Sequence, residues 1–177
     1  MTRSLHERSA VNVGPHVSST VAVENVSTEP CDEVTLGALA SFTIARLGLH
    51  PQDELSVRIV DEAEMAELHV TWMDEPGATD VLSFPMDELR PMVATVDRQP
   101  GLLGDIVLCP AFARRQALDE GKTADALSDI LAMLLVHGIL HLIGHDHATQ
   151  NEYDTMFATQ DEILEAWRAA GHRVVTS

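Results

Sequence analysis

The sequence predicts an α+β fold in a single domain. Four short segments have the alternation or apolar bias of β-strands, and five longer segments have the apolar spacing or capping residues of helices. A chain of 177 residues that is 45% hydrophobic has the length of one domain with a sizeable core. We therefore expect residues 21–177 to form one domain, with about five helices packed on the strands. Residues 1–20 lack either periodicity and are expected to be a disordered tail.

The first half of the chain alternates predicted strands and helices. Residues 21–26 (VAVENV) and 54–60 (ELSVRIV) alternate apolar and polar positions, which predicts two strands. Residues 35–47 have apolar residues at helical spacing. A second helix is expected over residues 61–73, where Asp61 is suited to be the N-cap.

The second half contains two further strands and three helices. The longest helix is apolar nearly all round, so it belongs inside the fold, with Thr123 as its expected cap and Gly144 at its end. The predicted elements are strands 81–86 and 104–109, a loop over 90–101 between them, and helices 110–118, 123–143 and 151–170.

The charge excludes one class of nucleic-acid protein. A net charge of −17 argues against non-specific coating of nucleic acid, which relies on many Lys and Arg side chains that neutralise phosphates. Any RNA must be contacted locally. Five basic residues precede the histidine-rich segment and are either ordinary surface charges or such local contacts: Arg90, Arg98, Arg114, Arg115 and Lys122.

Cysteine content and hydropathy indicate a cytoplasmic protein. Cys31 and Cys109 are too few and too far apart for a disulfide framework or a thiolate zinc site. The longest apolar run, residues 130–144, is shorter than the ~20 residues of a bilayer span and contains two histidines. The N-terminal residues lack the apolar segment of a secretory signal, and an organellar leader is the weaker alternative to a plain extension.

The segment HGILHLIGHDH, which starts at His137, predicts a metal site. His137 and His141 are four residues apart on a helix, so both side chains emerge from one face and can share an ion. On a continuous helix His145 would lie ~12 Å along the axis from His137, too far for both to reach a zinc ion at ~2.1 Å. Gly144 is suited to end the helix so that His147 folds back onto the metal.

The spacing of the three histidines is that of the metzincin peptidases, with one difference. Those enzymes have a Glu general base directly after the first His, and this chain has Gly138. One zinc ion with three neutral ligands keeps an open fourth position and lowers the pKa of bound water towards ~7. Hydrolysis therefore remains feasible, but peptide hydrolysis by the Glu mechanism does not.

Several neighbours of the predicted ligands have open roles. His145 is expected to be exposed or to lie just outside the ligand set. Asp146 and Glu152 either orient a ligand imidazole or cap the following helix. Asp80 and Asp105 flank strands that lead towards the site, so either is a candidate base or a plain carboxylate at a strand end.

Three sequence blocks together resemble a known family. HGILHLIGHDH, TDVLSFP at 79–85 and LGDIVLC at 103–109 resemble the YbeY family of bacterial rRNA endonucleases, over roughly residues 21–170. The resemblance implies an α+β fold around a four-stranded mixed sheet, and a zinc ion held by His137, His141 and His147. It also implies cleavage of single-stranded RNA, in maturation of the 3′ end of small-subunit 16S rRNA and in ribosome quality control, with the ribosome or its associated proteins as partners.

The resemblance breaks at a residue thought to bind phosphate. The family usually has an arginine where this chain has Met73. Arg90, Arg98 or Arg114 are candidate replacements, as are backbone N–H groups around Ser83. In the expected mechanism, zinc polarises a phosphodiester oxygen or presents hydroxide while arginines stabilise the developing charge, and the 2′-OH of RNA is the alternative nucleophile.

Two other functions compete with RNA cleavage. The first is a zinc hydrolase of a peptide or amide, which would need a carboxylate from elsewhere to replace the base missing at Gly138. The second is a non-catalytic, ribosome-associated factor with a structural zinc. A structural zinc is expected to have four protein ligands, whereas three ligands indicate catalysis.

Overall fold

The computed structural model describes residues 20–87, 99–123 and 126–173. Within these residues it has the four strands and five helices expected from the sequence, each within a few residues of its predicted bounds. In chain order they are β1 (Val21–Asn25), α1 (Glu33–Arg46), β2 (Glu54–Ile59), α2 (Glu62–Met73), β3 (Val81–Pro85), β4 (Leu102–Leu108), α3 (Pro110–Asp119), α4 (Leu127–Leu142) and α5 (Gln150–Ala169).

The strands form one mixed sheet in the order β1-β2-β4-β3. β1, β2 and β4 are parallel, and β3 is antiparallel to β4 at the edge of the sheet. The register between the last two strands pairs Ser83 with Ile106 and Phe84 with Asp105. Because successive side chains of a strand point to opposite faces, Ser83 and Ile106 share one face, and Phe84 and Asp105 share the other.

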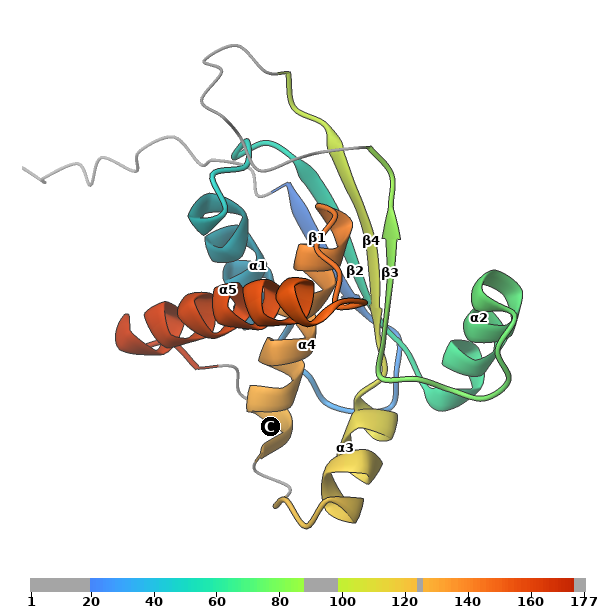
Figure 1. Cartoon of the computed structure of the whole chain (residues 1–177). Helices are drawn as coiled ribbons and strands as arrows, with labels where there is room; N and C mark the ends of the chain where they lie inside the picture. The colour runs from blue at the N-terminus through green and yellow to red at the C-terminus, as the bar shows by residue number, and fades with distance from the viewer. Residues whose placement is uncertain (1–19, 88–98, 124–125, 174–177) are drawn as a thin grey trace, which may run out of the picture.

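Helix α4 occupies the centre of the molecule. It packs on β3 and β4 with one side and against α1, α3 and α5 with others, so that α5 lies over it on the side away from the sheet (Figure 1). Its residues Leu131, Leu135 and Ile139 are completely buried in the main core. Helix α2 covers part of the opposite face near β3, where Met65 packs in a second, smaller core cluster.

Of two predicted helix caps, Asp61 is confirmed in position and Thr123 is wrong. Asp61 is the N-cap of α2, but its carboxylate makes no cap hydrogen bond. It accepts instead from the backbone N–H and the hydroxyl of Thr28, at 3.0 and 2.9 Å, and so ties the loop after β1 to the start of α2. Thr123 is not the cap of α4, which begins at Leu127 behind Ala126; the carbonyl of Thr123 accepts from the N–H of Ala126.

Some sequence predictions fall outside the described residues. The structure does not describe the predicted tail over residues 1–20, apart from Thr20, or most of the predicted loop over 90–101. Among the helices that are described, none is both long and apolar enough to cross a membrane.

Candidate metal centre

The end of α4 sets the geometry of the histidine-rich segment. Gly144 has a φ of +91°, the left-handed conformation predicted for the residue that ends this helix. The N–H of His145 donates to the carbonyl of Leu140, and the N–H of Gly144 donates to that of His141, both at 3.0 Å. These two bonds form a Schellman motif, which reverses the chain within a few residues. His147 is thereby carried back towards the last turn of α4.

Three imidazoles converge at this turn. Ligand atoms of His137, His141 and His147 all lie within 4.8 Å of one another. The Nε2 atoms of His137 and His141 are 3.1 Å apart, which is within the span of about 4 Å that two nitrogens bound to one zinc ion can have. His147, which is exposed, supplies the third ligand atom of this cluster. The arrangement can hold a metal ion.

The rings of the first two histidines are held by their other nitrogens. Nδ1 of His137 lies 3.0 Å from the side-chain oxygen of Gln160, and Nδ1 of His141 donates to the carbonyl of His145 at 3.0 Å. A neutral imidazole that donates through Nδ1 has its lone pair on Nε2. Both Nε2 lone pairs therefore point at the shared space, an orientation that metal-binding histidines require.

Burial favours the neutral form of these rings. It is the largest cause that lowers the pKa of His137 and of His141, and the neighbouring histidines act in the same direction. The hydrogen bond with Gln160 and, to a smaller extent, the charge of Asp80 oppose this lowering of the pKa at His137. A histidine must be neutral to bind a metal, so a lowered pKa leaves the proton a weaker competitor for the same nitrogen.

The pocket around the histidines is formed by α4, the turn after it, and the edge strand β3. Its volume is about 560 Å³. The described residues that line it include neither Lys nor Arg; they are Met73, Val81, Leu82, Ser83, Pro85, His137, His141, Gly144, His145, Asp146 and His147. The pocket thus offers a metal site and polar groups, but no fixed cation from this part of the chain.

Gly138 allows α4 to lie close to the sheet. A Cβ at this position would be 3.0 Å from the hydroxyl oxygen of Ser83 and 3.1 Å from a methyl carbon of Ile106. A larger side chain here would force the side chains of Ser83 on β3 and Ile106 on β4 to move. In this protein, the position of the metzincin general base is therefore a glycine packed closely against the sheet.

The side chains of the polar residues next to the ligands do not orient the ligand rings directly. His145 lines the pocket and orients His141 through its backbone carbonyl, and burial lowers the pKa of its own ring. Asp146 accepts from the N–H of His147 at 2.7 Å. Glu152 forms a capping box with Thr149 at the start of α5, which is the capping alternative considered for it above.

Among the described residues, the other candidate catalytic side chains, Arg114, Asp80 and Asp105, do not line the pocket around the histidines. Arg114 makes a bidentate ion pair with Glu29, at 2.9 and 2.6 Å, and does not line the pocket. Asp80 is engaged at the start of β3, where it accepts from the N–H of Val81 at 2.8 Å. Arg90 and Arg98 lie outside the described residues.

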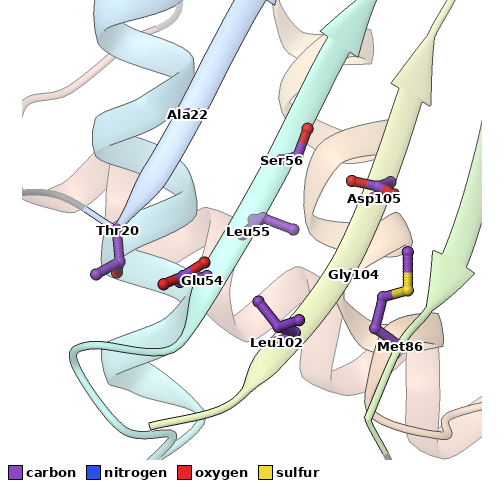
Figure 2. A pocket seen from close by; sticks show the side chains of 9 residues that line it. All are labelled: Thr20, Ala22, Glu54, Leu55, Ser56, Met86, Leu102, Gly104 and Asp105. Atoms are coloured by element: carbon purple, nitrogen blue, oxygen red, sulfur yellow. The ribbon is translucent and has the colours of Figure 1, made fainter.

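Asp105 lies on the opposite face of the sheet. Its neighbour Ile106 faces Gly138 on α4, so Asp105 must point away from that helix. Figure 2 shows its side chain near Ser56 of β2 and Met86. These residues line a separate pocket of about 260 Å³. Proton transfer between Asp105 and a substrate at the histidines is excluded by this placement.

The cysteines offer no competing ligand set. Burial, followed by the charge of Glu29, raises the pKa of the Cys31 thiol to about 11. Burial also raises the pKa of the Cys109 thiol. Both groups stay protonated near neutral pH, whereas zinc binds the thiolate.

Gln160 is the site residue that the sequence interpretation missed. It is 3% exposed on α5 and contacts His137 from the side away from the shared space. The sequence did contain a signal, because Gln160 is the polar member of the otherwise apolar inner face formed by Met156, Ile163, Leu164 and Trp167. A buried amide requires a hydrogen-bond partner, and here that partner is an imidazole.

The turn at Gly144 gives a first testable expectation. We expect Gly144→Val to weaken metal binding, because a β-branched residue resists the φ of +91° that brings His147 back. The conformational cost is roughly 1–2 kcal/mol. Isothermal titration with zinc would measure the loss of affinity. The control is Gly171→Val, which strains the end of α5 in the same way, at a φ of +83°. Equal zinc affinity in the two variants would contradict this role of the turn.

Comparison with known proteins identifies similar sequences over most of the chain. The family model described as endoribonuclease YbeY matches residues 21–168. A protein named endoribonuclease YbeY from Acidothermus cellulolyticus is 53% identical over 154 residues, covering 85% of this chain and 92% of the relative. A protein of the same name from Thermobifida fusca is 51% identical over 148 residues, covering 84% and 94%.

A solved structure has a similar fold. The solution structure of a Thermotoga maritima protein matches with a TM-score of 0.54 at 22% identity, covering 85% of this chain and 93% of that one. At this identity the match bears on the fold alone. It agrees with the mixed sheet and helical layers described above.

Proposed function

The chain belongs to the YbeY family of endoribonucleases, and from that premise we propose that it cleaves single-stranded RNA with one zinc ion held by His137, His141 and His147. The observation that carries the proposal is the orientation of the histidines. Two imidazoles are held through Nδ1 so that their Nε2 atoms converge beside an open pocket, and a third ring closes on the same point. A centre of this kind suits hydrolysis.

The donor set fits zinc. Three neutral imidazoles are the ligands of many catalytic zinc sites, and no fourth His, Cys, Asp or Glu joins the cluster within the described residues. When bound, zinc would supply the positive charge that polarises a phosphodiester oxygen and lowers the pKa of water. The absence of a fourth protein ligand in this part of the chain favours catalysis over the structural role considered above.

Phosphate is proposed to contact Ser83 and the backbone around it. Ser83 lines the pocket and lies against Gly138, one residue from a proposed ligand. Its hydroxyl can donate a hydrogen bond to a phosphate oxygen. Met73 lines the same pocket at the position of the family's arginine, and Arg114 is held by Glu29 elsewhere. Arg90 and Arg98 remain candidates from outside the described residues.

The cellular role is proposed to be maturation of the 3′ end of small-subunit 16S rRNA and ribosome quality control. Residues 21–177 would act as a single catalytic domain in the cytoplasm. The net charge of −17 supports recruitment by the ribosome or its associated proteins, since the chain has few cations with which to hold RNA by itself.

The decisive test combines metal content with cleavage of defined RNA. The purified protein should contain about one zinc per chain, and chelation should abolish cleavage of a single-stranded oligoribonucleotide until zinc is returned. A duplex of the same sequence should be cleaved far more slowly. Cleavage that survives complete removal of the metal, or equal cleavage of the duplex, would overturn the proposal.

Peptide or amide hydrolysis is not favoured. The metzincin base would have to occupy position 138, where a Cβ already meets Ser83 and Ile106. Asp105, a possible substitute, is on the other face of the sheet. Asp146 lines the pocket but accepts a hydrogen bond from the backbone of His147.

A further inference from the structure

Aromatic rings lie directly beside the proposed metal site. The whole chain has only seven aromatic residues of the Phe, Trp and Tyr types, namely four Phe, two Trp and one Tyr. One of them, Phe157 of α5, has its ring centroid 5.7 Å from that of His137 and 6.5 Å from that of His147. The single tyrosine, Tyr153, stacks on Phe157 with centroids 4.1 Å apart and an interplanar angle of 25°.

The outer ring of this pair is open to solvent. Tyr153 is 45% exposed, whereas Phe157 beneath it is partly buried against the histidines. The two residues are four apart on α5, a spacing at which aromatic side chains also stabilise a helix. Stabilisation of α5 explains why the two rings stack. It does not explain why the ring of Tyr153 is exposed to solvent beside the pocket. Ring faces of this kind bind the bases of single-stranded nucleic acid.

We propose that Tyr153 and Phe157 form a stacking platform for one base of the RNA, in a nucleotide next to the scissile phosphate. The proposal rests on the RNA-cleaving function proposed above. The platform borders the pocket through the contacts of Phe157 with His137 and His147, so a phosphate at the metal places a neighbouring base within reach of the rings.

The surrounding charge favours a base over a phosphate at this place. Glu152 and Asp154 flank Tyr153, and both carboxylates are held nearby, the first by Thr149 and the second by the side chain of Gln150. A phosphate approaching the ring would meet these charges. A base carries no charge, and its stacking energy does not depend on neutralising the backbone.

The platform also gives a physical reason for preferring single strands. A base in a duplex has both faces covered by its neighbours and cannot stack on a protein ring without leaving the helix. An unpaired base can turn outward at small cost. Selection for single-stranded RNA then follows from the shape of the site, in a protein whose described pocket residues include no Lys or Arg.

The test pairs a change in the ring with a change in the base. Tyr153→Leu removes the aromatic face but keeps apolar bulk, and Tyr153→Phe keeps the face. Trp72→Leu is the matched control, because Trp72 is 65% exposed and packs edge-to-face against Phe84, whose side chain lies on the face of the sheet away from α4. Zinc content is measured for each holoenzyme. Binding of a labelled single-stranded oligoribonucleotide is followed by fluorescence anisotropy before product forms, and KM and kcat are determined in parallel.

We expect Tyr153→Leu to weaken binding and raise KM about tenfold, the scale of one lost base stack, with zinc content unchanged. Tyr153→Phe and Trp72→Leu should behave like the original protein. An oligonucleotide with one abasic nucleotide, moved along the sequence, should weaken binding at one position by a similar factor. At that position, combining the abasic nucleotide with Tyr153→Leu should weaken binding no more than either change alone. The tenfold difference in affinity between the original protein and Tyr153→Leu should be the same at low and high salt.

Two results would overturn the platform. The first is RNA binding that is unchanged in Tyr153→Leu, and the second is full additivity of the ring and base changes at every position. Failure of the proposed function has a different signature. In that case the zinc-loaded original protein would neither bind nor cleave single-stranded RNA, and both proposals would fall.

Discussion

Replacing His137 or His141 with alanine is expected to remove zinc and RNA cleavage together. Each ring supplies one of two Nε2 atoms that are 3.1 Å apart, so either loss leaves two ligands for an ion that needs at least three from the protein. Loss of a residue that merely orients a metal ligand commonly costs 10–100-fold, so we expect loss of a ligand itself to exceed ~10²-fold in cleavage. His147→Ala should act in the same direction.

His145→Ala is the matched control for these variants. Its ring lines the pocket, but its contact with the ligand set is the backbone carbonyl that accepts from Nδ1 of His141, and alanine keeps that carbonyl. Zinc should be measured by mass spectrometry of the metal, beside cleavage of single-stranded RNA and thermal unfolding. Zinc retained in His147→Ala and lost in His145→Ala would show that the ligand assignment is wrong.

Local rules in the sequence predicted the architecture and the chain reversal near the site. Helical spacing placed His137 and His141 on one face, and the conformational freedom of glycine placed the turn at Gly144; the structure confirms both. The closeness of His147 to the other rings follows from these two facts. The C-terminal end of this helix and the spacing of its histidines are determined within a few residues, so both can be read from the sequence without tertiary information.

Contacts between distant elements were predicted poorly. Arg114 precedes the histidines in sequence, but on α3 it pairs with Glu29, which is 85 residues away. Asp105 is on the correct strand but on the wrong face, and strand alternation decides the face only once the neighbour that packs on α4 is known. Gln160 was missed because its partner is 23 residues away on another helix. Sequence spacing carries little information about such pairs.

Gln160→Leu is expected to weaken zinc binding by 10–100-fold while the protein stays folded. Leucine is similar in size to glutamine and suits a site that is 3% exposed between Met156 and Leu164, so the packing of α5 should survive. What it removes is the acceptor 3.0 Å from Nδ1 of His137. Without it the ring can rotate or adopt the other tautomer, which places a proton on the nitrogen that faces the metal.

The conservative change separates orientation from packing. Gln160→Glu keeps an acceptor oxygen near Nδ1 of His137 and should hold zinc at least as firmly as the original residue, since a carboxylate also makes the imidazole a stronger ligand. Zinc affinity from competition with a chelator, beside the free energy of unfolding of the metal-free proteins, distinguishes the two effects. A residue that only fills the core would change stability and leave zinc affinity alone. If Gln160→Leu binds zinc normally, the orientation of His137 is fixed by the packing of α4, and the hydrogen bond across the two helices has no part in metal binding.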